Sequence, residues 1–136
     1  MKKKLLILCT GNSCRSQMAE AYFRKFHGTT IEVFSAGIEK HGLNPTALRV
    51  LQEDGIDTTM LFSKTIEEID YNTADILLTV CDHAKETCPV VPSKAKKIHH
   101  SFPDPARFSG TESEILEGFR AVRDTIKLYA KNFSGS

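Results

Sequence analysis

The stretch C-T-G-N-S-C-R-S, residues 9–16, constrains this chain more than any other because it joins an apolar run to an amphipathic segment. Residues 4–8 before it are dominated by leucine and isoleucine, which is typical of a strand buried on both faces of a sheet. Residues 15–27 after it carry apolar side chains at helical spacing, and Gly28 ends the pattern. A strand that enters a helix through so short a loop predicts an α/β fold with a ligand site at the loop.

The rest of the chain continues this alternation of strands and helices. Further strands are predicted over residues 31–36, 76–80 and 97–102. Further helices are predicted from Pro45, after an Asn44 cap, to Gly55, from Thr65 to near Asp70, and from Thr111 to Phe133. Because crossovers between parallel strands are right-handed, the order predicts a four-stranded parallel sheet flanked by helices on both faces.

Composition limits the number of domains and the classes of partner that we expect for this chain. The 136 residues, 40% of them hydrophobic, fit one globular domain over residues 1–136. A net charge of +1 without a basic stripe argues against nucleic acid as a partner. The apolar start is shorter than the roughly 7 to 15 residues of a signal-peptide core, and no run approaches the roughly 18 of a membrane span. We therefore expect a cytoplasmic monomer that binds neither nucleic acid nor membrane.

The loop is suited to hold a tetrahedral oxyanion. A short glycine-containing loop that enters a helix directs several backbone N–H groups to one point, and the helix dipole adds positive potential there. Arg15 in the first turn can add a guanidinium fork that matches two oxygens of such an anion. Gly11 and Asn12 also have a simpler interpretation, because both residue types suit tight loops. The predicted oxyanion-binding residues are Thr10, Gly11, Asn12, Ser13, Cys14 and Arg15.

The same electrostatic field acts on Cys9 at the start of the loop. A free thiol has a pKa of ~8.5, which can fall to ~3.5 to 7.5 at a helix N-terminus beside a cation. The sequence therefore predicts that Cys9 is a thiolate at neutral pH. Ser16 could hold this sulfur by a hydrogen bond, or could simply cap or solvate the first helical turn. Cys14 is interpreted as structural.

Four cysteines in a reducing compartment are not expected to form a permanent disulfide framework. The intervals between Cys9 and Cys14 and between Cys81 and Cys88 do not fit the C-x2-C pairs of zinc sites. No metal and no cofactor are therefore expected. Cys81 follows the predicted strand 76–80, so in a parallel sheet it lies at the same carboxyl edge as Cys9.

The loop, followed by Q-M-A-E, resembles the phosphate-binding loop of the low-molecular-weight protein tyrosine phosphatase fold. Within that superfamily the chain is most similar to the thioredoxin-coupled arsenate reductases. The resemblance runs the length of the chain and includes the Cys81 and Cys88 pair and the segment Asp104, Pro105, Ala106. It implies that strand 76–80 neighbours the first strand, with the two backbones ~4.8 Å apart.

The resemblance implies a reaction as well as a fold. Cys9 would attack the arsenic of arsenate, and Asp104 would protonate the departing hydroxyl. Cys81 would then displace arsenite by forming a disulfide with Cys9, and Cys88 would attack Cys81. The family presents the resulting Cys81–Cys88 disulfide to thioredoxin, its electron donor. Asp104 has a simpler interpretation as a turn residue before proline.

Oxidation is expected to remodel residues 81–89. If residues 82–87 are helical in the reduced state, the two cysteines lie ~10 Å apart, beyond the ~7 Å limit for the Cα atoms of a disulfide. The segment must then unwind to form the bond. Its polar composition indicates few buried contacts that would oppose this change.

The sequence departs from the family at two positions. Some members hold potassium beside the loop with residues that match Asn12, Glu20 and Ser35, and with an aspartate where this chain has Lys64. We expect the Lys64 ammonium to take the place of the ion and to stabilise the loop through Glu20. Gln17 replaces the proline that phosphatases usually show after the serine.

Two other functions are compatible with the residues. The protein could be a phosphatase whose additional cysteines protect Cys9 from overoxidation. It could also be a redox-sensing or oxyanion-binding module without enzymatic activity, which signals by a change of shape at residues 81–89.

Overall fold

A computed structural model describes residues 2–39, 41–69, 71–81 and 95–134. Its four strands are β1 (Lys3–Cys9), β2 (Ile31–Gly37), β3 (Ile76–Thr79) and β4 (Lys96–His99). Its α-helices are α1 (Arg15–His27), α2 (Pro45–Glu53) and α4 (Glu112–Asn132). Three short 3-10 helices are η1 (Ile66–Glu68), η2 (Tyr71–Thr73) and η3 (Pro105–Arg107).

The strands form one parallel sheet in the order β2-β1-β3-β4. The central strand β1 pairs with β2 on one side, with Cys9 opposite Gly37, and with β3 on the other, with Leu8 opposite Thr79. The chain therefore moves from β1 to one side and later returns to the opposite side of the same strand. The carboxyl ends of β1 and β3 flank this reversal of direction, which is where open α/β sheets bind ligands.

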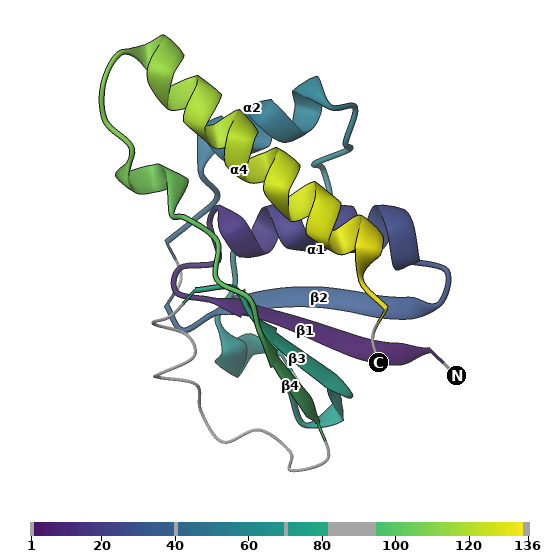
Figure 1. The fold of residues 1–136 in the computed structure, drawn as a ribbon. Helices are drawn as coiled ribbons and strands as arrows, with labels where there is room; N and C mark the ends of the chain where they lie inside the picture. Colours follow the sequence, from purple (N-terminus) through teal and green to yellow (C-terminus); the bar gives the residue numbers. More distant parts are fainter. Residues whose placement is uncertain (1, 40, 70, 82–94, 135–136) are drawn as a thin grey trace.

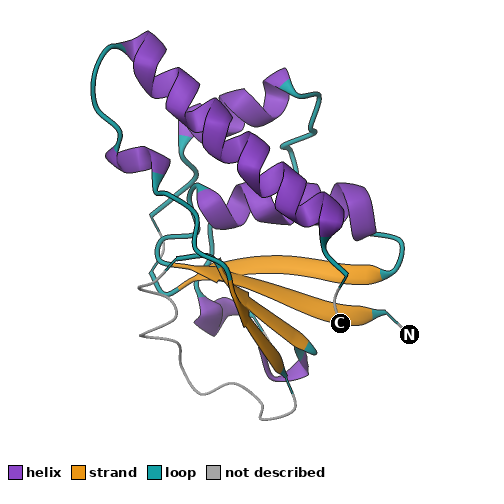
Figure 2. Ribbon diagram, in the orientation of Figure 1, coloured by secondary structure: helices purple, strands orange, loops and turns teal. Residues whose placement is uncertain are grey.

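In the described residues, α1, α2 and α4 lie on one face of the sheet with η3, and η1 and η2 lie on the other face (Figures 1 and 2). Helix α4 crosses α1 and α2, and the start of β1 and the end of α4 lie at the edge opposite the loop that follows β1 (Figure 1). The predicted four-stranded parallel sheet with helices on its two faces is confirmed.

Most predicted boundaries are close to those observed. Helix α1 spans the predicted residues, and the Asn44 side chain caps α2 by accepting from Thr46 N and Ala47 N. The predicted capping box of Thr65 and Glu68 is present, but the turn it opens is a 3-10 helix rather than an α-helix. Strand β4 is shorter than the predicted 97–102.

The end of β4 leaves the sheet because aromatic packing takes over. His100 stacks on Tyr129 of α4 with the ring centroids 4.2 Å apart, and the Phe102 ring packs edge-on against the same tyrosine. Their backbone N–H groups still donate to carbonyls of Thr79 and Val80. This path carries the chain over the carboxyl edge of the sheet, toward the loop that follows β1.

The core is built around β1 and the inner side of α1. Residues 5–8 of β1 are fully buried, as are Tyr22 and Phe23 of α1. The Phe23 ring makes edge contacts with Phe133 and Tyr129, with centroid distances of 5.0 Å and 6.3 Å. None of the helices in the described part of the chain is long and apolar enough to cross a membrane.

Replacing Phe23 by alanine tests this packing. We expect Phe23→Ala to lower the free energy of unfolding by about 3–5 kcal/mol, because a fully buried ring is lost and a cavity remains. Leu128→Ala is the control: this side chain of α4 is 61% exposed, and its loss should change stability by no more than about 0.5 kcal/mol. Urea unfolding measures both, and equal effects would contradict the proposed core.

Candidate active site

A cavity at the carboxyl edge of the sheet brings together residues from four separate segments of the chain. The β1–α1 loop forms its floor, and the segments after β2, β3 and β4 form its walls. Its lining residues are Cys9, Thr10, Gly11, Ser13, Cys14, Arg15, His41, Cys81, Ser101, Phe102, Asp104, Ala106 and Arg107. Nearly all the predicted site residues that the structure describes therefore lie in or next to one cavity.

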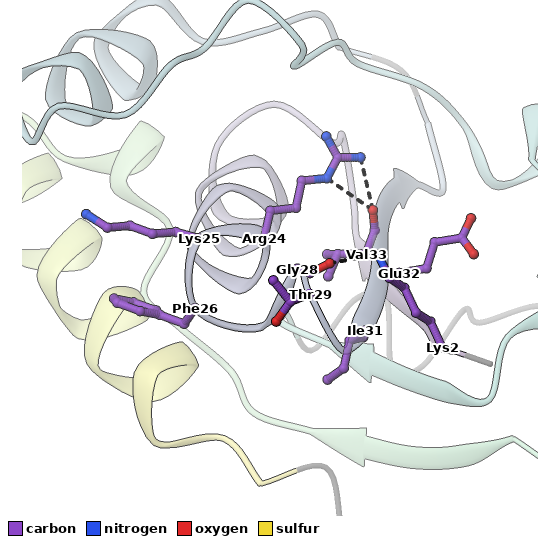
Figure 3. A pocket seen from close by; sticks show the side chains of 9 residues that line it. All are labelled: Lys2, Arg24, Lys25, Phe26, Gly28, Thr29, Ile31, Glu32 and Val33. Carbon is purple, nitrogen blue, oxygen red and sulfur yellow. Dashed lines mark hydrogen bonds between the residues drawn. The ribbon is translucent and has the colours of Figure 1, made fainter.

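A second cavity at the opposite edge of the sheet differs in its chemistry (Figure 3). Its lining contains basic side chains but neither cysteine nor histidine. Arg24 directs Nε and Nη2 to the Val33 carbonyl at 3.2 and 3.0 Å, and Lys2 Nζ donates to the Gly28 carbonyl at 2.9 Å. Arg24 and Lys2 are therefore hydrogen-bonded to backbone carbonyls near the end of α1 and in β2. Because the first cavity contains the cysteines, it is the candidate site.

Every carbonyl of residues 9–14 accepts a hydrogen bond from another group of the protein. Four donors are backbone N–H groups of the segment that follows β2: Ile38 to Cys9, Glu39 to Thr10, His41 to Gly11, and Asn44 to Ser13. Gln17 Nε2 serves the Asn12 carbonyl, and Met18 N serves that of Cys14. Trans peptides direct N–H and C=O to opposite sides, so the N–H groups of the loop face the cavity.

Asn12 holds the centre of the loop in a conformation that few residues adopt. It is fully buried and has a φ of 50°, the left-handed region that asparagine tolerates. Its side chain donates to Ser16 Oγ at 2.8 Å and to Ser35 Oγ at 2.9 Å, and accepts from Gln17 Nε2 and Lys64 N. A left-handed residue in such a loop turns successive N–H groups to one point and so makes an anion-binding concavity.

Helix α1 differs from the other two α-helices at its N-terminus. Asn44 and Thr111 cap α2 and α4 with their side chains, whereas Cys14 at the start of α1 makes no side-chain cap. The first N–H groups of α1 are therefore left for another acceptor. An oxyanion in the cavity would supply that acceptor and would also lie at the positive end of the helix dipole.

Arg15 and Asp104 meet across the cavity. Arg15 Nη1 donates to the Phe102 carbonyl at 3.1 Å, and its Nη2 lies 3.6 Å from Asp104 Oδ2. The other carboxylate oxygen, Oδ1, accepts from Ala106 N at 3.0 Å and caps η3. Asp104 is therefore a turn residue before proline, as the simpler interpretation expects. It also presents its other carboxylate oxygen to the Arg15 guanidinium in the cavity.

Cys9 and Cys81 are buried neighbours at the ends of β1 and β3. Their side chains are hydrogen-bonded to each other, and the Cys81 sulfur lies 3.2 Å from Thr10 Oγ1. The hydrogen bond with Cys81 and then burial raise the pKa of Cys9 well above its usual range, against the opposing effects of Arg15 and of the Thr10 N–H. The prediction that Cys9 is a thiolate at neutral pH is wrong for this arrangement. The cause is Cys81, whose proximity outweighs the expected field of the loop.

Cys14 is also buried, and burial is the main cause that raises the pKa of its thiol to about 11. Its side chain accepts a long contact of 3.9 Å from Ser13 Oγ. The three described cysteines are free thiols. Cys88 and residues 82–87, with the predicted remodelling of this segment, lie outside the described residues.

The four residues of the expected cation site lie together below the loop. Ser35 Oγ donates to Glu20 Oε1 at 2.7 Å, and Lys64 Nζ lies 3.5 Å from the same oxygen. Lys64 also donates to the Phe62 carbonyl and lies 4.3 Å from the centroid of the Phe62 ring. Burial lowers the pKa of Lys64, and the charge of Glu20 acts in the opposite direction. Asn12 joins the group through Ser35 and through the Lys64 backbone.

The sequence prediction missed two residues that shape the site. Gln17 is fully buried and links Asn12 to the Phe62 carbonyl at 2.8 Å. His41 lines the cavity and donates its backbone N–H to the Gly11 carbonyl. A signal for His41 was available, because residues after a second parallel strand reach the same carboxyl edge as the first.

Comparisons with known proteins agree with this geometry. The family described as Low molecular weight phosphotyrosine protein phosphatase matches residues 4–135. An arsenate reductase of Halalkalibacterium halodurans is 46% identical over 133 residues, covering 98% of this chain and 96% of that protein.

Solved structures point to the same group of proteins. One described as an arsenate reductase in the reduced state is 32% identical, with a TM-score of 0.73 over 96% of this chain and 95% of the other. An arginine phosphatase from Geobacillus stearothermophilus is 27% identical, with a TM-score of 0.74 over 94% and 88%.

The effect of Cys81 on Cys9 can be measured directly. Because the hydrogen bond with Cys81 is the largest cause that raises the pKa of Cys9, Cys81→Ala should lower this pKa and increase the thiolate fraction at neutral pH. Alkylation of Cys9 by iodoacetamide, followed by peptide mass spectrometry, should then be faster, by about three- to fourfold for each pKa unit, because a thiolate of lower pKa is also a weaker nucleophile. Cys14→Ala is the matched control and should leave the rate at Cys9 nearly unchanged. A slower reaction in Cys81→Ala would contradict the assignment.

Proposed function

The chain belongs to the low-molecular-weight phosphotyrosine protein phosphatase family, and we propose that its reaction is the reduction of arsenate to arsenite. The observation that carries the proposal is the second buried thiol, Cys81, hydrogen-bonded to Cys9 inside an oxyanion cavity. Hydrolysis of a phosphoester requires one nucleophile, whereas reduction requires a second thiol to take up the oxidation. The similarity to proteins named arsenate reductase supports the same choice.

The first step of the proposed reaction joins sulfur to arsenic. The N–H groups of the loop and the Arg15 guanidinium hold the oxygens of arsenate. Cys9 gives its proton to an oxygen of the bound dianion, and its sulfur attacks arsenic. Asp104 protonates the hydroxyl that departs, so one As–O bond breaks and water leaves. The Ser16 hydroxyl oxygen accepts a hydrogen bond from Asn12 Nδ2. The Ser16 hydroxyl proton therefore remains available for donation to the Cys9 sulfur.

The second step transfers two electrons. Cys81 attacks the Cys9 sulfur, an S–S bond forms, and the electron pair of the S–As bond remains on arsenic. Arsenic is thereby reduced from the pentavalent to the trivalent state and leaves as arsenite. Thr10, with its hydroxyl 3.2 Å from the Cys81 sulfur, is the residue that positions this thiol.

Regeneration is proposed to pass through Cys88. Its thiolate attacks Cys81 and releases Cys9, and the dithiol of thioredoxin reduces the Cys81–Cys88 disulfide. This step is supported by the sequence resemblance alone. Because the proposed relay requires its three cysteines to be reduced at the start, we also propose that the protein works in a compartment that keeps thiols reduced, such as the cytoplasm.

A phosphatase is the second candidate, because the N–H groups of the β1–α1 loop, here called the cradle, would suit phosphate as well as arsenate. A related structure is also an arginine phosphatase. The contact with Cys81 argues against it as the main activity. Hydrolysis makes no use of a second buried thiol beside Cys9, whereas reduction needs one to form the disulfide.

One assay distinguishes the candidates. Wild-type protein with thioredoxin, thioredoxin reductase and NADPH should consume NADPH only when arsenate is present. Cys88→Ser should stop this turnover but still release about one equivalent of arsenite per chain and leave a Cys9–Cys81 disulfide.

Other outcomes have defined meanings. Turnover that survives Cys88→Ser would indicate another reductant, such as glutathione. Hydrolysis of an aryl phosphate without arsenite formation would indicate a phosphatase. If neither activity is found, the redox-sensing or oxyanion-binding module remains.

We propose that the Lys64 ammonium serves in place of a bound potassium ion. Its contact with Glu20 at 3.5 Å puts a fixed positive charge next to the residues that hold Asn12. The wild-type rate should then agree within about twofold between potassium and sodium chloride at equal ionic strength. Lys64→Asp should depend on potassium, because the substitution supplies a carboxylate that can ligate the ion. A wild-type rate that depends strongly on potassium would overturn this assignment.

A further inference from the structure

His41 and Glu39 form a hydrogen-bonded pair at the wall of the catalytic cavity. His41 Nε2 lies 2.7 Å from Glu39 Oε2, and His41 is one of the lining residues together with Cys9 and Asp104. Both residues of the pair are fixed to the loop by their backbones: Glu39 N donates to the Thr10 carbonyl and His41 N to that of Gly11. The imidazole is therefore held against the cradle by its own main chain.

The ring packs directly on Gly11. A Cβ atom at this position would overlap the imidazole at Nδ1 and Cγ. Gly11 does not have a positive φ, so the close approach of His41, rather than backbone conformation, requires a glycine here. Since Nε2 is engaged by Glu39, Nδ1 is the ring nitrogen that faces the loop.

The proposed function creates a need for such a group, and the following inference rests on that function. In the first step, the Cys9 thiol, the hydrogen arsenate dianion and one proton give a thioarsenate monoanion and water. In the second, that monoanion, the Cys81 thiol and one further proton give the disulfide and neutral arsenite. Each step therefore consumes one proton in addition to the proton of its thiol.

The cavity contains few side chains that can supply these protons. The guanidinium groups of Arg15 and Arg107 do not serve as general acids. The thiol protons of Cys9 and Cys81 are already counted, and Cys14 is a buried thiol interpreted as structural. Asp104 faces Arg15 from the segment after β4 and can serve one step. Among the described lining residues, His41 is the other side chain of a type that serves as a general acid.

We propose that His41, oriented by Glu39, is the proton donor for the step that releases arsenite. Nδ1–H gives its proton to an oxygen on arsenic as Cys81 attacks Cys9 and the S–As bond breaks. His41 is half-exposed, so solvent can return the proton after product leaves. Asp104 serves the first step from the opposite wall.

The test measures a single turnover and anion binding separately. His41→Ala should slow arsenite release and formation of the Cys9–Cys81 disulfide about 100-fold in rapid-quench experiments, the usual range for loss of a general acid. Its affinity for inorganic phosphate, measured by calorimetry, should change by less than about threefold, since the N–H groups and Arg15 hold the anion. Phosphate binding also shows that the variant is folded.

Chemical rescue distinguishes proton donation from a positioning role. Added imidazole should restore the rate of His41→Ala, whereas it should not restore His41→Gln, whose side chain fills the site. Glu39→Gln should cause a smaller loss, because the ring remains but loses its orienting carboxylate. Glu67→Gln removes an exposed carboxylate of η1 and should have no effect.

The outcomes that overturn the inference are distinct. An unchanged single-turnover rate in His41→Ala overturns it. So does a slower rate without imidazole rescue that is matched by a proportional loss of phosphate affinity, which would show that His41 acts on binding. If wild-type protein makes no arsenite, both this inference and the proposed function are overturned, whereas normal wild-type activity with active His41 variants overturns this inference alone.

Discussion

The site depends on one backbone arrangement, in which the segment after β2 holds the carbonyls of the β1–α1 loop away from the cavity. Because each peptide directs its N–H opposite to its C=O, this arrangement presents a row of donors to any anion in the loop. At the Asn12 carbonyl the donor is a side chain, Gln17 Nε2, which also donates to the Asn12 side-chain oxygen. Under the proposed function, the main chain and Arg15 would bind the anion, which leaves the other side chains of the cavity available for chemistry.

The two thiols show how one contact serves opposite needs. Proximity to Cys81 holds Cys9 protonated at rest, which makes it a poor general nucleophile. A disulfide between Cys9 and Cys81 would require the same proximity, because the two sulfurs could then bond without movement of the sheet. Under the proposed function, bound arsenate takes the Cys9 proton itself, so the thiolate forms only when its reaction partner is present.

Much of the fold could be predicted from the sequence because the signals are local. The spacing of apolar residues in α1 and the Asn44 cap of α2 depend only on neighbours in the chain, and both are observed. The pKa of Cys9 could not be predicted in the same way, because it depends on a thiol more than seventy residues away. The general position of His41 could have been predicted, because it follows a strand parallel to β1, but the packing of its ring on Gly11 depends on the tertiary structure. The early end of β4 also coincides with tertiary packing, because His100 stacks on Tyr129 of α4.

The strand order places the loop residues and Cys81 on different parts of the sheet. The cradle is built by β1, α1 and the connection that follows β2, whereas Cys81 comes from β3 on the other side of β1. Under the proposed function, a change at position 81, just after β3, would thus leave the loop that binds the oxyanion intact while removing the thiol that supplies electrons. Hydrolytic and reducing proteins could in this way diverge from one ancestor by exchanging what lies on the neighbouring strand, with no need to rebuild the loop that both would share.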